Sequence, residues 1–310
     1  MAARLTFVCI CVGVAAITST PFVAGQRARL ASDAAIDIAE HAALNPDAES
    51  GRWNEAYAPF KLIGNIHYVG TAGISAYLIT TPKGHFLIDG ILPQSAQLII
   101  ANIKALGFRI GDVKYLLNTH AHYDHAGGLA RLQRASGAIM VASAGDKPFL
   151  EAGDIGHGPG GGIKFPPVRV DRIVIDGEKL SLGGVTLTAF MTPGHSPGCT
   201  SWSLDAVGAD KQRKRVFLNC SETVAGQSLV PEAYSGIVAN FRATFAKVRK
   251  MKADIFLANH EMLFDLHAKR ARQIAGDANA FVDPSELQRF NTEMEQAFEA
   301  KLKSQKGNQR

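Results

Sequence analysis

Three histidines and one aspartate lie within six consecutive positions, His120-Ala121-His122-Tyr123-Asp124-His125. They follow the apolar segment 113–117, which is typical of a buried strand. Side chains two positions apart in extended backbone point to the same side, so His120 and His122 should face one centre. Asp124 and His125 fall where the chain turns into a helix and should face a neighbouring centre. The pattern predicts a two-metal site. Its ligands suit zinc, and iron and manganese remain open.

Two further histidines follow predicted strands in the same way. His195 follows segment 185–191, and His260 follows segment 255–258. Because one cluster of four ligands leaves two metal ions incompletely coordinated, these two histidines are candidates for the open positions, and hydrogen-bonded structural histidines are the alternative. His157 lies in a glycine-rich stretch that can approach the site, and the isolated histidines elsewhere are interpreted as structural.

The elements that must position these residues are strands followed by helices. Apolar runs predict strands at 62–69, 75–80, 85–89, 113–117, 138–142, 172–175, 185–191, 200–204, 216–219 and 254–258. Helical spacing predicts helices at 93–106, 126–135 and 237–251, and Ser285 is a candidate N-cap for a helix to about residue 301. This order fits two similar half-sheets packed face to face with helices outside. By itself it supports only an α/β or α+β class.

No linker divides the chain after its first residues. The richest glycine stretch, 153–162, lies in the middle of the predicted domain. It is interpreted as a mobile surface loop, which together with the segment near Trp53 would line the cleft. We therefore expect residues 25–310 to form a single domain.

The N-terminus has the order typical of a secretory signal peptide. Arg4 precedes the apolar run 5–17, and small and polar residues follow up to Gln26. We interpret residues 1–24 as the signal, with cleavage near Ala24 or Gly25 and a periplasmic location. A buried N-terminal helix is the alternative, and the run is short for a membrane anchor. Residues 28–44 are predicted to form a helical arm.

The chain contains 4 cysteines, and Cys9 and Cys11 leave with the signal. Because an exported protein meets an oxidising compartment, the remaining pair, Cys199 and Cys220, favours a disulfide. A hairpin turn near residues 209–210 would place the two cysteines roughly opposite each other. Two buried thiols are the alternative.

The charge and composition exclude several classes of protein. The chain is 46% hydrophobic and 20% charged, which excludes a disordered protein. Its net charge is +5, and removal of the signal takes away Arg4 and no acid. The last ten residues hold four basic residues and no acid, so the rest of the mature domain is formally neutral. We therefore expect no nucleic-acid partner.

The motif His-x-His-x-Asp-His, together with Pro193-Gly194-His195 and His260, resembles the signature of the metallo-β-lactamase superfamily. The segment ending at Asp89-Gly90 is similar to the family's early strand-end aspartate motif. The resemblance runs from about Trp53 to the C-terminal helix. It implies a four-layer αββα sandwich with two metals at the strand ends between the half-sheets. Asp89 would act behind the ligands, fixing one of them or a nearby turn.

Within the superfamily the chain is most similar to subclass B3 metallo-β-lactamases. This resemblance assigns one zinc to His120, His122 and His195, and the other to Asp124, His125 and His260. Where glyoxalase II and many other members carry a bridging aspartate, this chain has Asn219-Cys220-Ser221. Ser221 falls near a non-ligand position of the subclass. Other lactamase subclasses use a cysteine ligand there, which leaves Cys220 as a competing candidate.

The resemblance implies a hydrolase that opens the β-lactam amide of penicillins, cephalosporins and carbapenems and gives antibiotic resistance. A metal-bound hydroxide would attack the carbonyl carbon, with Asp124 accepting its hydrogen bond, while Ser221 and Thr223 would hold the substrate carboxylate. The implied cofactor is two Zn²⁺ per chain. The enzyme is expected to be a monomer without a membrane partner after signal cleavage. The alternatives are another exported hydrolase of this fold, such as a lactonase or phosphodiesterase, or a non-enzymatic metal- or nucleic-acid-binding protein.

Overall fold

The computed structural model describes residues 52–308. The predicted signal at 1–24, the helical arm at 28–44, and both Cys9 and Cys11 lie outside the described residues, so these assignments stay predictions. Within residues 52–308, no helix combines the length and apolar character that crossing a bilayer requires.

The first sheet has seven strands that neighbour one another in chain order. Pairing is antiparallel from β1 to β4 and parallel from β4 to β7, so the ends of β4, β5 and β6 meet at one edge. The strands are β1 (Phe60–Ile63), β2 (Ile66–Tyr68), β3 (Tyr77–Thr81), β4 (Gly84–Ile88), β5 (Val113–Leu117), β6 (Ile139–Ser143) and β7 (Arg172–Val174).

The second sheet has five strands in the order β12-β11-β10-β9-β8. Its pairs are antiparallel except for β11 with β12, which are parallel. The strands are β8 (Lys179–Leu182), β9 (Val185–Met191), β10 (Thr200–Val207), β11 (Arg213–Asn219) and β12 (Ile255–Ala258).

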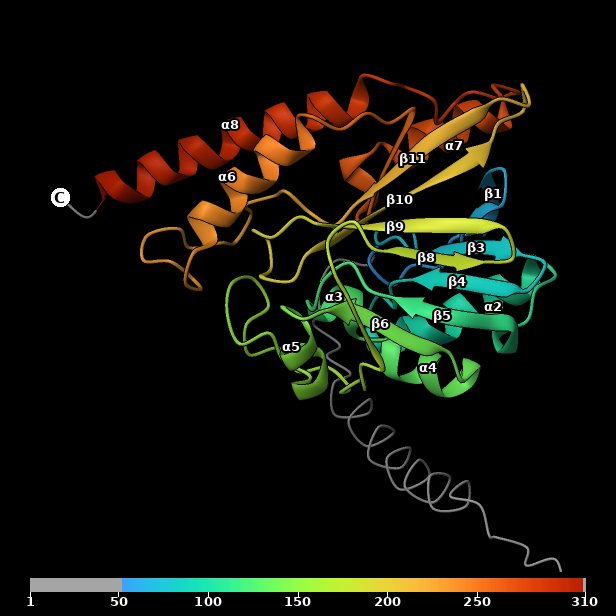
Figure 1. Ribbon diagram of the computed structural model, residues 1–310, viewed down its shortest axis with the longest axis horizontal. Coiled ribbons are helices and arrows are strands. Elements are labelled where there is room, and N and C mark those ends of the chain that lie inside the picture. Colours follow the sequence, from blue (N-terminus) through green and yellow to red (C-terminus); the bar gives the residue numbers. More distant parts are fainter. Residues whose placement is uncertain (1–51, 309–310) are drawn as a thin grey trace, which may run out of the picture.

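Helices cover the outer faces of the two sheets, as Figure 1 shows, with α2 and α4 on one side and α6, α7 and α8 on the other. This is the predicted four-layer sandwich. The helices are α2 (Ala96–Ala105), α3 (Tyr123–Ala126), α4 (Leu129–Ser136), α5 (Lys147–Ala152), α6 (Ile237–Val248), α7 (Leu266–Ile274) and α8 (Glu286–Gly307). Short 3₁₀ turns lie at Pro93–Ser95, Ile110–Asp112 and Glu261–Leu263.

The main core lies between the sheets. Phe86 and Ile88 of β4 and Trp202 and Leu204 of β10 are buried in one apolar cluster. Polar atoms are paired across the same interface: the Tyr77 hydroxyl donates to the carbonyl of Ala258 at 2.6 Å. The two sheets are therefore fixed to each other close to the strand ends that carry the predicted ligands.

The observed elements differ from the predicted ones mainly at their ends. The predicted strand 62–69 is broken by a turn at Gly64, whose φ is +54°. Ser285 precedes α8 as predicted, but its hydroxyl donates to Asp283 instead of capping the helix. Helix α8 also continues six residues beyond the predicted end at 301. Helices α5 and α7 and strand β8 were not predicted, because α5 and β8 are short and the sequence of α7 is mostly polar.

Candidate metal centre

The clustered motif spans the connection from β5 to α3. His122 has an extended backbone (φ −73°, ψ 149°) and directly precedes α3, which carries Asp124 and His125. The amides of His125 and Ala126 both donate to the carbonyl of His122, at 3.0 and 2.8 Å, and fix the turn. The chain thus has the predicted strand, turn and helix, with the two pairs of polar side chains on different elements.

The first ligand group contains His120, His122 and His195. Nε2 of His120 lies 2.9 Å from Nδ1 of His122. The ring of His195 lies 4.8 Å from that of His120 and 4.6 Å from that of His122, centroid to centroid. One nitrogen from each ring falls within 4.8 Å of the other two, so the three imidazoles converge on one point.

The second ligand group contains Asp124, His125 and His260. Oδ2 of Asp124 lies 3.3 Å from Nε2 of His125 and 3.3 Å from Nε2 of His260. The two imidazole nitrogens are themselves 3.1 Å apart. The ring centroids of His120 and His125 are 4.4 Å apart, so the two groups are direct neighbours.

His260 is brought to the site by the second sheet. It follows β12 and pairs with Ile74 in an antiparallel bridge. The amide of Ser75 donates to the carbonyl of Asn259 at 2.9 Å, and the amide of Glu261 donates to that of Gly73. Segment 73–75, which connects β2 and β3 of the first sheet, therefore holds the residues on both sides of His260.

The electrostatics of four of the six residues fit a bound cation. Burial, with the neighbouring imidazoles, lowers the pKa of His120 and His122 well below the usual value, and burial lowers that of His195 to about 4. Burial opposes ionisation of Asp124, but His125 and His260 outweigh it and hold its pKa well below its usual range. Neutral imidazoles in the first group and an ionised carboxylate in the second are the protonation states in which such residues bind metal. In contrast, although burial opposes protonation of the adjacent His125, the Asp124 carboxylate raises its pKa.

Other polar groups orient the histidine rings through their outer nitrogens. Nδ1 of His195 lies 2.9 Å from the carbonyl of Thr223, which leaves Nε2 free to face the centre. Nδ1 of His120 lies 3.3 Å from both Thr119 Oγ1 and Asn259 Nδ2. Contacts of this kind fix the tautomer and the ring plane of a ligand.

Asp89 lies behind the second ligand group, where it was predicted. Its Oδ2 is 3.8 Å from Nδ1 of His125. The amide and the hydroxyl of Thr119 donate to its two carboxylate oxygens, each at 2.7 Å. Burial raises the pKa of Asp89 to about 6. Its backbone is left-handed, with φ +64°, a conformation that turns the chain sharply after β4.

The two predicted substrate-binding hydroxyls lie at the end of β11. Ser221 is buried, and its Oγ has no hydrogen-bond partner within residues 52–308. Thr223 is partly exposed, and its Oγ1 accepts the amide of Ala225 at 3.1 Å. The neighbouring Glu222 points into the interior, where its Oε1 accepts Asn219 Nδ2 at 2.6 Å.

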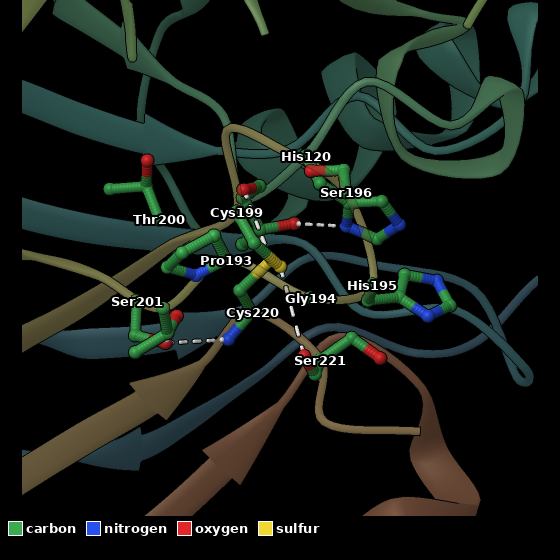
Figure 2. Close-up of a disulfide and its surroundings, with 12 residues drawn as sticks. His120, Pro193, Gly194, His195, Ser196, Cys199, Thr200, Ser201, Cys220 and Ser221 are labelled. Atoms are coloured by element: carbon green, nitrogen blue, oxygen red, sulfur yellow. Dashed lines mark hydrogen bonds between the residues drawn. A yellow bond between two sulfur atoms is a disulfide. The ribbon is translucent and has the colours of Figure 1, made fainter. Parts of the chain in front are cut away.

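Cys199 and Cys220 form a disulfide, which confirms the predicted pairing. Their Cα atoms are 5.8 Å apart. Figure 2 shows the bond between the loop of His195 and the end of β11, with the ring of His120 beside it. Both sulfurs lie within 4.8 Å of a ring nitrogen of His120. Because each sulfur is bonded to the other, Cys220 is not free to act as a metal ligand here.

The sequence predicts that two segments, the one near Trp53 and the glycine-rich segment 153–162, line the cleft. The ring of Trp53 lies 5.5 Å from that of His260. In the glycine-rich segment 153–162, the ring of His157 packs against Phe149 and Tyr234, at 5.3 and 5.0 Å. Neither ring nitrogen of His157 has a hydrogen-bond partner in the described part of the chain.

Helix α8 supports the loop that follows Ser221 and Thr223, the predicted substrate-binding residues. Lys301 Nζ donates to the carbonyl of Val224 at 2.7 Å. Oε1 of Gln305 accepts the amides of Leu229 and Val230, at 2.7 and 3.0 Å. Within this loop Gln227 Nε2 donates to the carbonyl of His195 at 2.8 Å, so the support extends to a ligand loop.

Sequence reasoning missed the residues that hold the ligand loops from a distance. Thr119 adjoins the motif and Asn259 precedes His260, so both could have been recognised as polar neighbours of ligands. Asp146 and Gln227 lie far from the motif along the chain, and their residue types are ordinary for loops. Only the packing of the two sheets brings them to the site.

Comparison with known proteins gives both a family and similar structures. The family model described as the metallo-beta-lactamase superfamily matches residues 69–260. The fold is similar to the crystal structure of BJP-1, a subclass B3 metallo-beta-lactamase of Bradyrhizobium japonicum, with a TM-score of 0.80 and 43% sequence identity. The similarity covers 84% of this chain and 99% of that one.

Curated relatives with other activities match over shorter stretches. The N-acyl homoserine lactonase AttM of Agrobacterium fabrum is 32% identical over 210 residues, which is 64% of this chain and 77% of that protein. The hydroxyacylglutathione hydrolase of Rhodospirillum rubrum is 32% identical over 106 residues. That match spans 34% of the length of each protein.

Proposed function

The chain belongs to the metallo-beta-lactamase superfamily, and from this premise we propose that it is a zinc-dependent β-lactamase. In this proposal it hydrolyses the amide bond of penicillins, cephalosporins and carbapenems with two Zn²⁺ per chain, acts as a monomer, and gives antibiotic resistance. The similarity to a subclass B3 enzyme over 99% of that enzyme's chain supports this choice of substrate.

One observation carries the proposal: six buried or half-buried ligands form two adjacent groups of three. His120, His122 and His195 would hold one ion, and Asp124, His125 and His260 the other. The loop after β11 places no carboxylate between the two groups, because the carboxylate of Glu222 accepts a hydrogen bond from Asn219 in the interior. Cys220 is not free to be a ligand either, because it forms a disulfide with Cys199. The absence of a bridging carboxylate at residues 219–223 favours a β-lactamase over a glyoxalase II.

Different side chains of the site would have different roles in the reaction. When bound, zinc at this site would make water acidic enough to act as a nucleophile at neutral pH and would polarise the amide carbonyl. Asp124, held ionised by its two histidines, accepts a hydrogen bond from the attacking oxygen. Ser221 offers an unpartnered hydroxyl to the substrate carboxylate, and Thr223 offers a second. Thr223 also orients His195 through its carbonyl, which couples substrate binding to the first ligand group.

Hydrolysis of a carbapenem, with and without a chelator, tests the proposal. We expect turnover by the zinc-loaded protein, loss of turnover with a chelator, and recovery with added zinc. His195→Ala should lower kcat/KM at least a hundredfold, since it removes one of three ligands. His267→Gln is the matched control, because this histidine lies outside both ligand groups. A zinc-loaded chain that turns over no β-lactam would overturn the proposal.

A lactonase is the second candidate function. The observation in its favour is the match to a lactonase over 77% of that protein's length. A panel of lactone, ester and phosphodiester substrates, measured beside the β-lactams on the same zinc-loaded sample, separates the two. A kcat/KM for a lactone well above that for every β-lactam would select the lactonase.

We also propose that the chain is exported to the periplasm and cleaved near Ala24 or Gly25. The order of basic, apolar and small residues at the N-terminus supports this proposal. The neutral charge of the domain body supports a small-molecule substrate in preference to nucleic acid. N-terminal sequencing of the mature protein tests the cleavage, and an intact Met1 would contradict it.

A further inference from the structure

A buried carboxylate that is not one of the six ligands joins the loops that carry them. Asp146 lies between β6 and α5 and is 1% exposed. Its Oδ2 accepts the amide of Ala121 and the hydroxyl of Ser196, each at 3.1 Å. Its Oδ1 accepts the amide of Gly198 at 3.0 Å. All three partners donate, so an ionised carboxylate satisfies every one of them.

The three partners belong to the two loops of the first ligand group. Ala121 lies between His120 and His122, in the loop that follows β5 of the first sheet. Ser196 and Gly198 lie just after His195, in the loop between β9 and β10 of the second sheet. One carboxylate therefore connects the loop of two ligands with the loop of the third, across the junction of the sheets.

The close packing around Asp146 leaves its carboxylate little freedom. A Cβ on Gly198 would lie 2.2 Å from the Asp146 amide nitrogen, and one on Gly145 would lie 2.8 Å from Cα of Gly198. The hydroxyl of Ser143 donates to the carbonyl of Gly198 at 2.6 Å and accepts the Asp146 amide at 3.2 Å. The end of β6 is thus hydrogen-bonded to the His195 loop through the side chains of Ser143 and Asp146.

The position of Asp146 before a helix does not account for its carboxylate. An aspartate immediately before a helix usually accepts an amide of the first turn. In the described chain Asp146 makes no such capping bond to α5. Its hydrogen bonds go instead to the two ligand loops. A buried carboxylate costs free energy unless it is fully hydrogen-bonded, and here the loops supply those bonds.

We propose that Asp146 is a positioning residue that sets the placement of His195 relative to His120 and His122, and so determines the metal affinity of the first ligand group. A different carboxylate supports the second group. Asp89 accepts a hydrogen bond from Thr119 and lies beside His125. Asp146 has no hydrogen bond to Asp124, His125 or His260 among the described residues. Its loss should therefore weaken one metal site more than the other. This inference rests on the proposed metal centre and not on the proposed substrate.

The test is the metal content and metal affinity of Asp146→Asn in the full-length chain. An amide at this position can accept at only one atom, so it leaves an NH₂ facing a donor. With Zn²⁺ and with Co²⁺, titrated against a competing chelator, we expect wild type to bind two ions. We expect the variant to keep one ion with near-normal affinity and to bind the other about tenfold to a hundredfold more weakly. The Co²⁺ absorption spectrum should lose the contribution of one site.

Asp171→Asn is the matched control. Asp171 also accepts a backbone amide, that of Met140 at 3.0 Å, and it accepts Gln133 Nε2 at 2.8 Å, but it touches neither ligand loop. The Asp171→Asn variant should bind both ions like wild type. It therefore distinguishes a loss of ligand positioning from a general loss of stability. If Asp146→Asn does not fold, Ser196→Ala removes one of the three bonds and should weaken the same site severalfold.

Three results would overturn the inference, and they are distinguishable. Two-ion binding by Asp146→Asn within twofold of wild type would overturn it alone. For a variant that does not fold, unchanged affinity in Ser196→Ala would do the same. A wild-type chain that binds neither Zn²⁺ nor Co²⁺ would instead overturn the proposed metal centre, and this inference with it.

Discussion

At the scale of single residues, the hydroxyl of Ser221 is a group that could bind substrate. This hydroxyl is buried beside the ligand groups and has no partner within residues 52–308. A buried, unpaired hydroxyl is costly, and in enzymes such a group is commonly matched by the substrate. A β-lactam carboxylate would supply the missing acceptor.

Ser221→Ala should therefore impair binding of the substrate more than the reaction itself. A hydrogen bond to a charged group contributes about 1.5–3 kcal/mol, so we expect KM to rise about tenfold or more with kcat changed less than threefold. Steady-state kinetics with one penicillin and one carbapenem measure both constants. Ser228→Ala is the control, since that hydroxyl donates to Pro231 within the next loop. An unchanged KM would contradict the role of Ser221.

The six ligand candidates were predictable because their signals are local. His120 to His125 share one short motif, and His195 and His260 each follow a recognisable strand. Asp146 gave no such signal, because its partners are 25 to 52 residues away along the chain. The residue types needed for chemistry thus stand out in a sequence, whereas the residues that hold them depend on which loops meet in the folded chain.

At the scale of elements, the hairpin of β10 and β11 shows why strand ends are hard to predict. The predicted strands end at residue 204 and begin again at 216, but the observed strands continue to the pair Val207 and Arg213. Asp205 and Arg215 face each other across the strands and form an ion pair at 3.3 Å. Charged residues are favourable in exposed strands when they pair across the ladder, and a single segment does not reveal that pairing.

Removal of the disulfide that joins the two ends of this hairpin should lower the stability of the protein. The bond closes a loop with a sequence separation of 21, which corresponds to about 3 kcal/mol in the free energy of unfolding. Cys199→Ala/Cys220→Ala should lower the denaturant midpoint accordingly. A reductant should destabilise wild type and leave the double variant unchanged. Equal midpoints for wild type and the double variant would show that the disulfide adds no stability.

At the scale of the whole molecule, the candidate metal centre lies where the two sheets meet. The first sheet supplies four ligand candidates through the β5–α3 connection, and the second supplies His195 and His260. Neither sheet alone completes either a group of three or the hydrogen bonds of Asp146. Metal binding and packing of the sheets should therefore be strongly coupled.

The stability of the whole molecule should also depend on pH through Glu222. Burial raises the pKa of Glu222 to about 8 in the folded chain, above its value of about 4.3 when unfolded. Between these values the folded state keeps a proton that the unfolded state releases. The stability from this group is thus fully present below about pH 4 and is lost as pH rises towards 8.

Glu222→Gln should remove much of this dependence, because an amide stays neutral at every pH. We expect its Tm to exceed that of wild type by several degrees at pH 8.5 and by much less at pH 5.5. Thermal unfolding across this range, with Glu293→Gln as an exposed control on α8, measures the difference. Profiles of wild type and Glu222→Gln that run parallel would argue against a protonated Glu222.

The support that α8 gives to the loop after β11 has a consequence for the order of synthesis. Lys301 is made 77 residues after Val224, the residue whose carbonyl it binds, and Gln305 is made 76 residues after Leu229. All six ligand candidates precede both residues in translation. A growing chain can therefore contain every ligand of the metal centre before the wall that carries Ser221 and Thr223 has its final support. During synthesis, the growing chain would therefore be able to bind metal before it is able to bind substrate.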